Sequence, residues 1–313
     1  MTQTDKQKNR SCVNLTRACV LEKRYCLTLL TPLLTVVLLL TSCNTFWNPP
    51  HNNSQSSPPV LDSGDLTGQV HIVGSTALLP LAAKAVDLFH QRHPNVEIDA
   101  QGGGSITGLK AVTSYQADIG DSDISADPAL YPNADLTDHI VCMSAFTLIV
   151  NPQVTVASLT TQQVIDIFTG VTTNWEEVGG SNLPITAVIR PASSGTKAVF
   201  RHYVLGGLEE TGKPLVSDSN TTVVDAVAHT PGAIGYVTIA VLNPLVKPVG
   251  LDGTSATEQN ILAGRYTFWS FEHMYTLQNG VNATTAFLDF MQTPEIQRLA
   301  QNLGYIPVSH LRQ

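Results

Sequence analysis

The pattern of apolar and polar positions predicts alternating strands and helices in the first third of the chain. Gly68–Val73 and Val96–Gln101 alternate like strands that bury one face. Apolar positions at helical spacing follow each of them, in Pro80–Gln91 and from Ile106 to about Tyr115. With a short strand at Ala117–Gly120, this order is typical of an α/β lobe with parallel strands.

The rest of the chain continues the same alternation. Apolar strands are expected at His139–Val150 and Ile185–Ile189, and another follows the turn at Pro231-Gly232. Helices are expected at Thr161–Thr169, Lys197–Val204, Val223–His229, Thr284–Gln292 and Pro294–Leu303. The chain therefore has enough elements for two packed lobes.

The two lobes are expected to be built from interleaved segments, because no internal repeat and no second linker divide the chain. Lobe 1 is expected to comprise residues 67–146 and 238–313, and lobe 2 residues 147–237. The chain then crosses between the lobes near Ser144–Leu148 and near Tyr236–Ile239. These crossings would act as a hinge.

The N-terminus has the organisation of an export signal. A basic, polar stretch precedes an apolar run, Cys26–Leu40, which is short for a membrane span and contains Pro32. The run ends in Leu40-Thr41-Ser42-Cys43, which resembles the bacterial lipobox, so residues 1–42 are interpreted as a lipoprotein signal peptide and Cys43 as the lipidated residue. The alternative is an uncleaved N-terminal anchor. Either arrangement places the body outside the cytoplasm, attached to the cell membrane.

Residues 43–66 are rich in Pro, Asn and Ser and have almost no periodic apolar pattern, so they are interpreted as a flexible tether. Beyond Cys43 the only cysteine is Cys142, which lies within an apolar strand. A single cysteine in that position is expected to pack in the core rather than act as a nucleophile, and no disulfide is expected.

The charge of the chain is unevenly distributed. Residues 1–42 carry six Lys or Arg and two Asp or Glu, whereas the remaining residues carry 11 basic and 23 acidic side chains. An acidic body argues against nucleic acid as a partner, because binding to a phosphate backbone depends on clustered Lys and Arg. An anion could still bind to this body through local geometry.

Three turns share an arrangement suited to an anion: a strand ends, Gly and Ser or Thr follow, and a helix begins. They are Gly74-Ser75-Thr76, Gly104-Ser105 and Ser193-Ser194-Gly195-Thr196. A helix start exposes unpaired N–H groups and the positive end of the peptide dipole. One such turn is an ordinary N-cap. Three converging turns could enclose an oxyanion with few positive charges.

Six sequence landmarks resemble the phosphate-binding proteins of bacterial ABC-type phosphate importers, and they occur in the order found in that family. They are GSTALLPL (74–81), QGGGSITGLKAV (101–112), ADIGDSDIS (117–125), RPASSGTKAVF (190–200), TPGAIGYV (230–237) and FLDFMQTPEIQRLAQNLGYIPV (287–308). The resemblance implies an α/β, two-lobe fold of the periplasmic-binding-protein type II kind, with a hinge and a ligand cleft between the lobes. It also implies a monomer that delivers inorganic phosphate to the transmembrane subunits of an ABC permease.

The resemblance also places the ligand-binding residues. Thr76, the backbone of Ala77 and the neighbouring Ser75 would contact the anion from the first turn, and Ser105 from the second. Asp123 matches a carboxylate found in some members of the family. From the other lobe, the site would be closed by Arg190, Ser194, Gly195 and Thr196.

Arg190 and Asp123 have distinct chemical roles in this hypothesis. The Arg190 guanidinium can donate to two ligand oxygens at once; the alternative is an ion pair at the surface or between the lobes. A buried Asp123 carboxylate repels an anion unless the ligand supplies a proton, which hydrogen phosphate has and sulfate lacks. The alternative for Asp123 is a helix cap or turn residue.

Three positions depart from the family pattern. An acidic residue commonly follows the arginine by two positions, where this chain has Ala192. Asp121 is an additional acid, which would weaken anion binding or require a cationic neighbour if it points inward. The segment Phe268–His273 lacks the proline usual in the family.

Other functional classes fit the sequence less well. No Gly-x-Ser-x-Gly elbow supports an enzyme around Ser194, and His90 and His93 have no evident third ligand for a metal. The run Gly103–Lys110 lacks the spacing of a nucleotide P-loop. The chain is therefore expected to be no enzyme and to need no cofactor. A binding protein for molybdate, tungstate or sulfate, or a sensor or adhesion protein of the same fold, remains an alternative.

Overall fold

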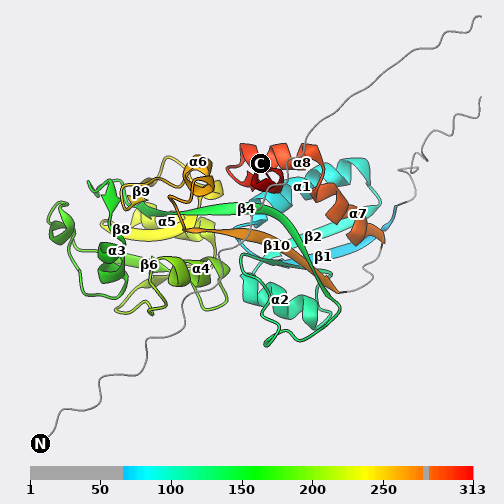
Figure 1. The fold of residues 1–313 in the computed structure, drawn as a ribbon, viewed down its shortest axis with the longest axis horizontal. Coiled ribbons are helices and arrows are strands. Elements are labelled where there is room, and N and C mark those ends of the chain that lie inside the picture. Colours follow the sequence, from blue (N-terminus) through cyan, green and yellow to red (C-terminus); the bar gives the residue numbers. More distant parts are fainter. Residues whose placement is uncertain (1–65, 278–281, 313) are drawn as a thin grey trace, which may run out of the picture. The chain divides into compact units, whose positions relative to one another are not determined.

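The computed structural model describes residues 66–277 and 282–312 (Figure 1). The expected signal peptide, the lipidation site Cys43 and the expected tether up to residue 65 lie outside the described residues. None of the helices in the described part is long and apolar enough to cross a membrane.

The first described elements form a parallel arrangement of strands joined by helices. They are β1 (Gly68–Gly74), α1 (Leu79–Arg92), β2 (Val96–Gly102), α2 (Ser105–Thr113) and β3 (Ile119–Ser122). Strand β1 lies between β2 and β3 and pairs in parallel with both. Helix α1 buries one apolar face because its small and large apolar residues recur at helical spacing. The predicted α/β lobe with parallel strands is confirmed.

A second group of parallel strands follows later in the chain. Strand β6 (Thr186–Ile189) pairs in parallel with β7 (Leu215–Val216) and β8 (Ala233–Thr238). The main helices of this part are α3 (Thr161–Phe168), α4 (Gly195–Tyr203) and α5 (Asn220–His229). The predicted helices were correct in number and place here, although α4 begins two residues and α5 three residues earlier than expected.

One long strand belongs to both groups. Strand β4 (Leu136–Val150) pairs along Leu136–Ala145 with β10 (Trp269–Leu277) and along Phe146–Val150 with β8. All pairings of β4 are antiparallel, and its last ten residues are buried. The strands therefore follow one another in the order β2-β1-β3-β10-β4-β8-β6-β7. Figure 1 shows β4 running between the two sets of helices.

The chain does not return to β3 at Tyr236–Ile239, where the second crossing was expected. Strand β9 (Lys247–Leu251) comes after that segment and still pairs with Leu148–Val150 of β4. The return is made by β10, which pairs with both β4 and β3. Strand β10 was not predicted from the sequence because its buried face carries polar residues, among them Ser270 and Glu272.

The remaining elements complete the two ends of the fold. They are β5 (Ser158–Leu159), η1 (Trp175–Val178), η2 (Ile239–Val241), α6 (Glu258–Leu262), α7 (Asn282–Met291), α8 (Pro294–Asn302), β11 (Ile306–Pro307) and η3 (Val308–Arg312). Helices α7 and α8, both expected from the sequence, pack against α1.

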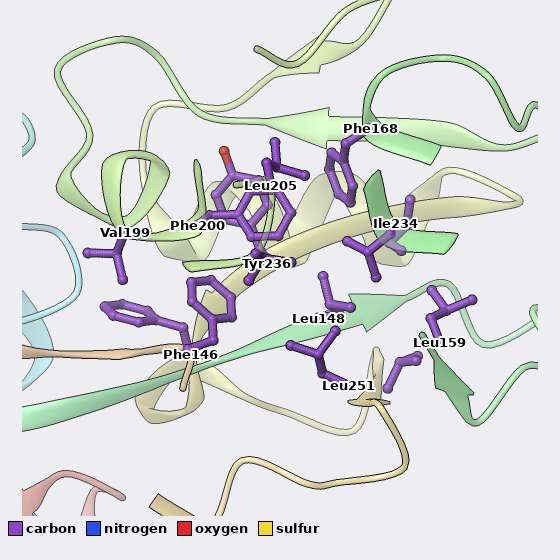
Figure 2. Close-up of a cluster of buried hydrophobic side chains, with 14 of the residues drawn as sticks. Phe146, Leu148, Leu159, Phe168, Val199, Phe200, Leu205, Ile234, Tyr236 and Leu251 are labelled. Atoms are coloured by element: carbon purple, nitrogen blue, oxygen red, sulfur yellow. The ribbon is translucent and has the colours of Figure 1, made fainter. Parts of the chain in front are cut away.

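A buried aromatic cluster holds α4 against the sheet (Figure 2). The rings of Phe200 on α4 and Tyr236 on β8 stack with their centroids 4.1 Å apart, and Phe168 and Phe268 also contact Phe200. Aromatic pairs of this kind add to the stabilisation from burial alone. The cluster therefore fixes the position of α4, whose N-terminus belongs to the candidate site.

Candidate functional site

The second and third Gly-Ser/Thr turns lie in direct contact. The backbone N–H of Ile106 donates to the carbonyl of Ser193 over 3.1 Å. A Cβ atom at Gly195 would lie 2.1 Å from Ser105 Oγ and 2.9 Å from Asp123 Cβ. Only glycine fits this close approach. The structure thus brings together turns that are about 90 residues apart in the sequence.

The Asp123 carboxylate joins these two turns. It accepts hydrogen bonds from Ser105 Oγ to Oδ1 over 3.2 Å and from Thr196 Oγ1 to Oδ2 over 2.7 Å. Its own backbone N–H donates to Ser105 Oγ over 2.9 Å. None of the described backbone N–H groups donates to this buried carboxylate. The alternative role of Asp123 as a helix cap is therefore wrong for the described part of the chain.

Arg190 is buried and is held mainly by the main chain. Its Nε donates to the carbonyl of Ser217 over 3.0 Å, and its Nη2 donates to the carbonyl of Asp218 over 2.9 Å and to Thr76 Oγ1 over 3.0 Å. These carbonyls orient the guanidinium in place of the carboxylate that the family often has at the position of Ala192. Arg190 is 1% exposed and makes no salt bridge within the described residues, so the alternative of an ion pair is wrong.

The charge of Arg190 is therefore not cancelled by a direct partner. Burial lowers the pKa of its guanidinium, and the charge of Asp123 acts in the opposite direction. An arginine remains protonated in proteins even so. Its Nη1 is buried and has no hydrogen-bond partner among the described residues. A donor of this kind is costly to leave unpaired, so it could bind an anionic ligand.

In the first turn, Ser75 has a structural role that the sequence did not indicate. Its Oγ accepts the N–H groups of Ala77 and Leu78, each over 3.0 Å, and donates to Glu272 Oε2 over 3.4 Å. The Ala77 N–H expected to face an anion is thus bonded to Ser75 in this structure. Thr76 is the residue of the turn that contacts Arg190, which lies just before the third turn.

Asn220 belongs to the site and was not found by sequence analysis. Its Nδ2 and its backbone N–H donate to Thr76 Oγ1 over 3.0 and 3.3 Å, and its Oδ1 accepts the N–H of Thr238 over 2.9 Å. It begins α5, behind the capping residue Ser219. The signal was the same as in the other turns, a strand followed by Ser and a helix start. Strand β7 has only two residues and was too short to be recognised.

The third turn forms the beginning of α4. Ser194 is the N-cap, and its Oγ accepts the N–H of Lys197 over 3.2 Å. Gly195 and Thr196 are the first two residues of the helix, and both are buried. The positive end of the helix dipole therefore lies beside Asp123, and a negative charge is stabilised there.

A further network fastens this helix to Arg190. The hydroxyl of Tyr236 donates to Glu210 Oε1 over 2.7 Å and accepts the backbone N–H of Arg190 over 3.3 Å. The ammonium of Lys197 on α4 pairs with the same Glu210, whose side chain is 2% exposed. Burial, together with the charge of Glu210, raises the pKa of Tyr236 well above its ordinary value, so the phenol keeps its proton.

Two more acids are buried next to Asp123. Asp121 lies next to the first turn, because its backbone carbonyl accepts the N–H of Ser75 over 3.0 Å. Glu272 lies on β10. Burial raises the pKa of both carboxyl groups well above the ordinary range, and the charge of Asp123 raises them further. The sequence raised the question of a cationic neighbour for Asp121. Within the described residues no Lys, Arg or His forms a salt bridge with it.

A cavity of about 660 Å³ opens beside Asp123. Trp269, Phe271 and His273 of β10 line one side, and His202 and Tyr203 of α4 line another. Trp269 therefore lies next to the cluster of hydroxyl and charged groups. Among residues 66–277 and 282–312, no group of three or more His, Cys, Asp or Glu is arranged to hold a metal ion.

Comparisons with known proteins show the family of the chain. A family model described as a PBP superfamily domain matches residues 54–295. The phosphate-binding protein PstS of Bacillus subtilis is 34% identical over 279 residues, which cover 88% of this chain and 92% of that protein. The PstS protein of Pseudomonas aeruginosa is 25% identical, with 80% and 86% covered.

Solved structures show the same fold. A Clostridium perfringens structure, described as a phosphate ABC transporter substrate-binding protein with bound phosphate, matches with a TM-score of 0.73 and 28% identity. It covers 77% of this chain and 100% of its own. An ABC-type phosphate transport receptor from Vibrio cholerae matches with a TM-score of 0.62 and 26% identity, covering 76% and 99%. The expected two-lobe periplasmic-binding-protein fold is confirmed.

Removal of the Tyr236 hydroxyl tests the network behind Arg190. Tyr236→Phe leaves the buried Glu210 carboxylate without one donor and the Arg190 N–H without its acceptor. We expect the free energy of unfolding to fall by about 1–3 kcal/mol, measured by urea denaturation. Tyr203→Phe on the exposed side of α4 is the control and should change it by less than about 0.5 kcal/mol. Equal effects of the two substitutions would contradict a role for this hydroxyl.

Proposed function

Because the chain belongs to the PBP superfamily and is 34% identical to a phosphate-binding protein over most of its length, we propose that it captures inorganic phosphate and delivers it to an ABC importer. The observation that carries this proposal is the cluster of Arg190, Asp123 and three hydroxyl side chains at helix starts, all buried. The function is binding without a covalent step.

The proposed ligand-binding residues are those that the sequence singled out. They are Ser75, Thr76, Ala77, Ser105, Asp123, Arg190, Ser194, Gly195 and Thr196. Arg190 supplies a positive charge and a buried donor, and the start of α4 supplies the helix dipole. In our proposal the ligand oxygens take over bonds that the Thr76 and Thr196 hydroxyls make here with Arg190 and Asp123.

Asp123 supplies the proposed selectivity. A carboxylate that receives hydroxyl donors on both oxygens can also accept a hydrogen bond from a ligand P–OH group. Sulfate, molybdate and tungstate carry no such proton near neutral pH. Their oxygens would face a buried negative charge, which is costly.

Capture is proposed to involve closure of the two lobes about β4 and β10. Both strands run continuously between the two groups of parallel strands, so bending at these strands would move Arg190 relative to Thr76. The lobe boundaries, with the return at β10 in place of Tyr236–Ile239, remain part of this proposal, as does a monomeric state.

Attachment to the membrane through Cys43 is supported by the order of the basic stretch, the apolar run and the small residues before the cysteine. The mature protein would then lie outside the cytoplasm and begin at Cys43. Mass spectrometry of the N-terminal peptide from membrane-extracted protein checks this assignment. An unmodified peptide that continues upstream of Cys43 would contradict it.

Calorimetric titration of the purified full chain, freed of bound anion, tests the proposed ligand. We expect tight binding of phosphate and no response to sulfate, molybdate or tungstate. Arg190→Gln should weaken phosphate binding at least about 30-fold, because truncating one partner of a buried charge pair costs about 2–5 kcal/mol. Arg201→Lys, which keeps the charge of an exposed arginine, is the control.

Other outcomes of the titration distinguish the alternative functions. Binding of tungstate, molybdate or sulfate in preference to phosphate would keep the site and overturn the ligand. A folded protein that binds none of these anions would favour a sensor or adhesion role.

The selectivity assigned to Asp123 is tested by Asp123→Asn. The amide removes the buried negative charge with little change in shape, so we expect the ratio of phosphate to sulfate affinity to fall at least about tenfold. The measurement is competition between the two anions at constant pH. Asp135→Asn, at an exposed position, should leave the ratio unchanged. A ratio that Asp123→Asn does not alter would remove this carboxylate from the account.

A further inference from the structure

Asp121 and Glu272 lie on one face of the β3–β10 pair, and Asp123 lies just beyond the end of β3. In the antiparallel register, Met274 is opposite Asp121 and His273 is opposite Ser122. The register with β4 shifts between Glu272 and His273, but the aromatic rings at every second position of β10 remain in contact across this point, Phe271 with His273 and His273 with Tyr275. Glu272 therefore shares the other face with Met274, and so with Asp121. Asp123 lies in the bend that follows β3, two residues after Asp121, and its charge acts on both of the other carboxyl groups. Three carboxyl groups are therefore gathered where the proposed ligand also carries negative charge.

The groups around these acids supply little positive charge. Two titratable groups on neighbouring elements interact with the charge of Glu272: Cys142 of β4 and Tyr305 after α8. Burial raises the pKa of both groups, so both stay neutral. His273 bonds instead to Asp138. Arg190 is the cation that interacts with Asp123. Three ionised carboxylates beside one guanidinium and a phosphate dianion would be strongly repulsive.

The hydrogen bonds of the two inner acids also differ from those of Asp123. Asp123 receives a hydroxyl donor on each oxygen. Asp121 Oδ1 and Glu272 Oε1 are buried and have no partner among the described residues. Glu272 Oε2 receives a long bond from Ser75, over 3.4 Å. An ionised carboxylate needs several donors when it is buried, and these two groups lack them.

We propose that Asp121 and Glu272 are protonated in the native protein and act as neutral positioning residues that leave Asp123 as the single negative charge of the site. Glu272 positions the first turn through Ser75, whose Oγ holds the N–H groups of Ala77 and Leu78. The effect of this protonation on phosphate binding rests on the proposed function. The protonation of Asp121 and Glu272 does not depend on that function.

Protonation of buried carboxyl groups has a measurable effect on the free energy of unfolding. A carboxyl group with a raised pKa in the folded state stabilises the protein fully below its unfolded pKa, near 4, and this contribution is lost as the pH rises toward the folded pKa. Each such group makes the folding equilibrium constant fall about tenfold per pH unit in that window. An amide in its place removes this dependence.

The test compares wild type with Glu272→Gln and Asp121→Asn by urea unfolding of the full chain without phosphate, between pH 5.5 and 7.5. We expect the ratio of each variant's folding constant to that of wild type to rise about tenfold per pH unit. Glu176→Gln, at an exposed glutamate, should give a flat ratio. A flat ratio for Glu272→Gln or for Asp121→Asn overturns the proposal for that residue.

If a variant does not fold, infrared spectroscopy of the wild-type chain decides instead. A carboxylic acid C=O band at pH 7 that shifts in heavy water is expected, and its absence overturns the proposal.

Phosphate affinity at pH 7 gives a separate readout. We expect neither amide variant to gain phosphate affinity, because each replaces one neutral group by another and removes no negative charge. A gain of more than about tenfold would show that a charge had been removed, and would overturn the proposal. If wild type itself binds no phosphate, the proposed function fails, while the stability measurement still decides the protonation.

Discussion

The contact between Arg190 and Thr76 is the interaction on which the site depends. It joins Thr76 of the first turn to Arg190, which lies 114 residues later and just before the third turn, and it buries a full positive charge. Burial of that charge is costly unless its N–H groups are bonded. The carbonyls of Ser217 and Asp218 supply that compensation, and Asn220 fixes the acceptor Thr76. The surrounding elements therefore hold the Arg190 guanidinium in a fixed position.

Strand β4 makes this contact geometrically feasible. One continuous strand pairs first with β10 and then with β8, so it links the two groups of parallel strands directly. The helix starts α2 and α4 then meet closely enough that Gly195 has no room for a side chain. The aromatic cluster under α4 keeps this approach fixed, since the stacked rings of Phe200 and Tyr236 tie the helix to β8 (Figure 2).

The sequence was sufficient for the parallel strands β1, β2, β3, β6 and β8, for the principal helices and for the three turns, because glycine and hydroxyl residues between a strand and a helix are a local signal. Asn220 was missed because the strand before it has two residues, and Glu272 because it is a charged residue on the buried face of β10. Local patterns could not show that main-chain carbonyls replace the acid usual at Ala192. That replacement depends on β7 and α5, which are distant in sequence.

The way in which Arg190 is anchored also separates ligand capture from the surface of the protein. Its partners are dipoles and hydroxyls in the interior, where dissolved ions screen charges far less than at the surface. Exposed acidic side chains farther from the site than a Debye length are, in contrast, largely screened by dissolved ions. Substitutions among those outer charges would therefore change the net charge of the body more than the electrostatic environment of Arg190.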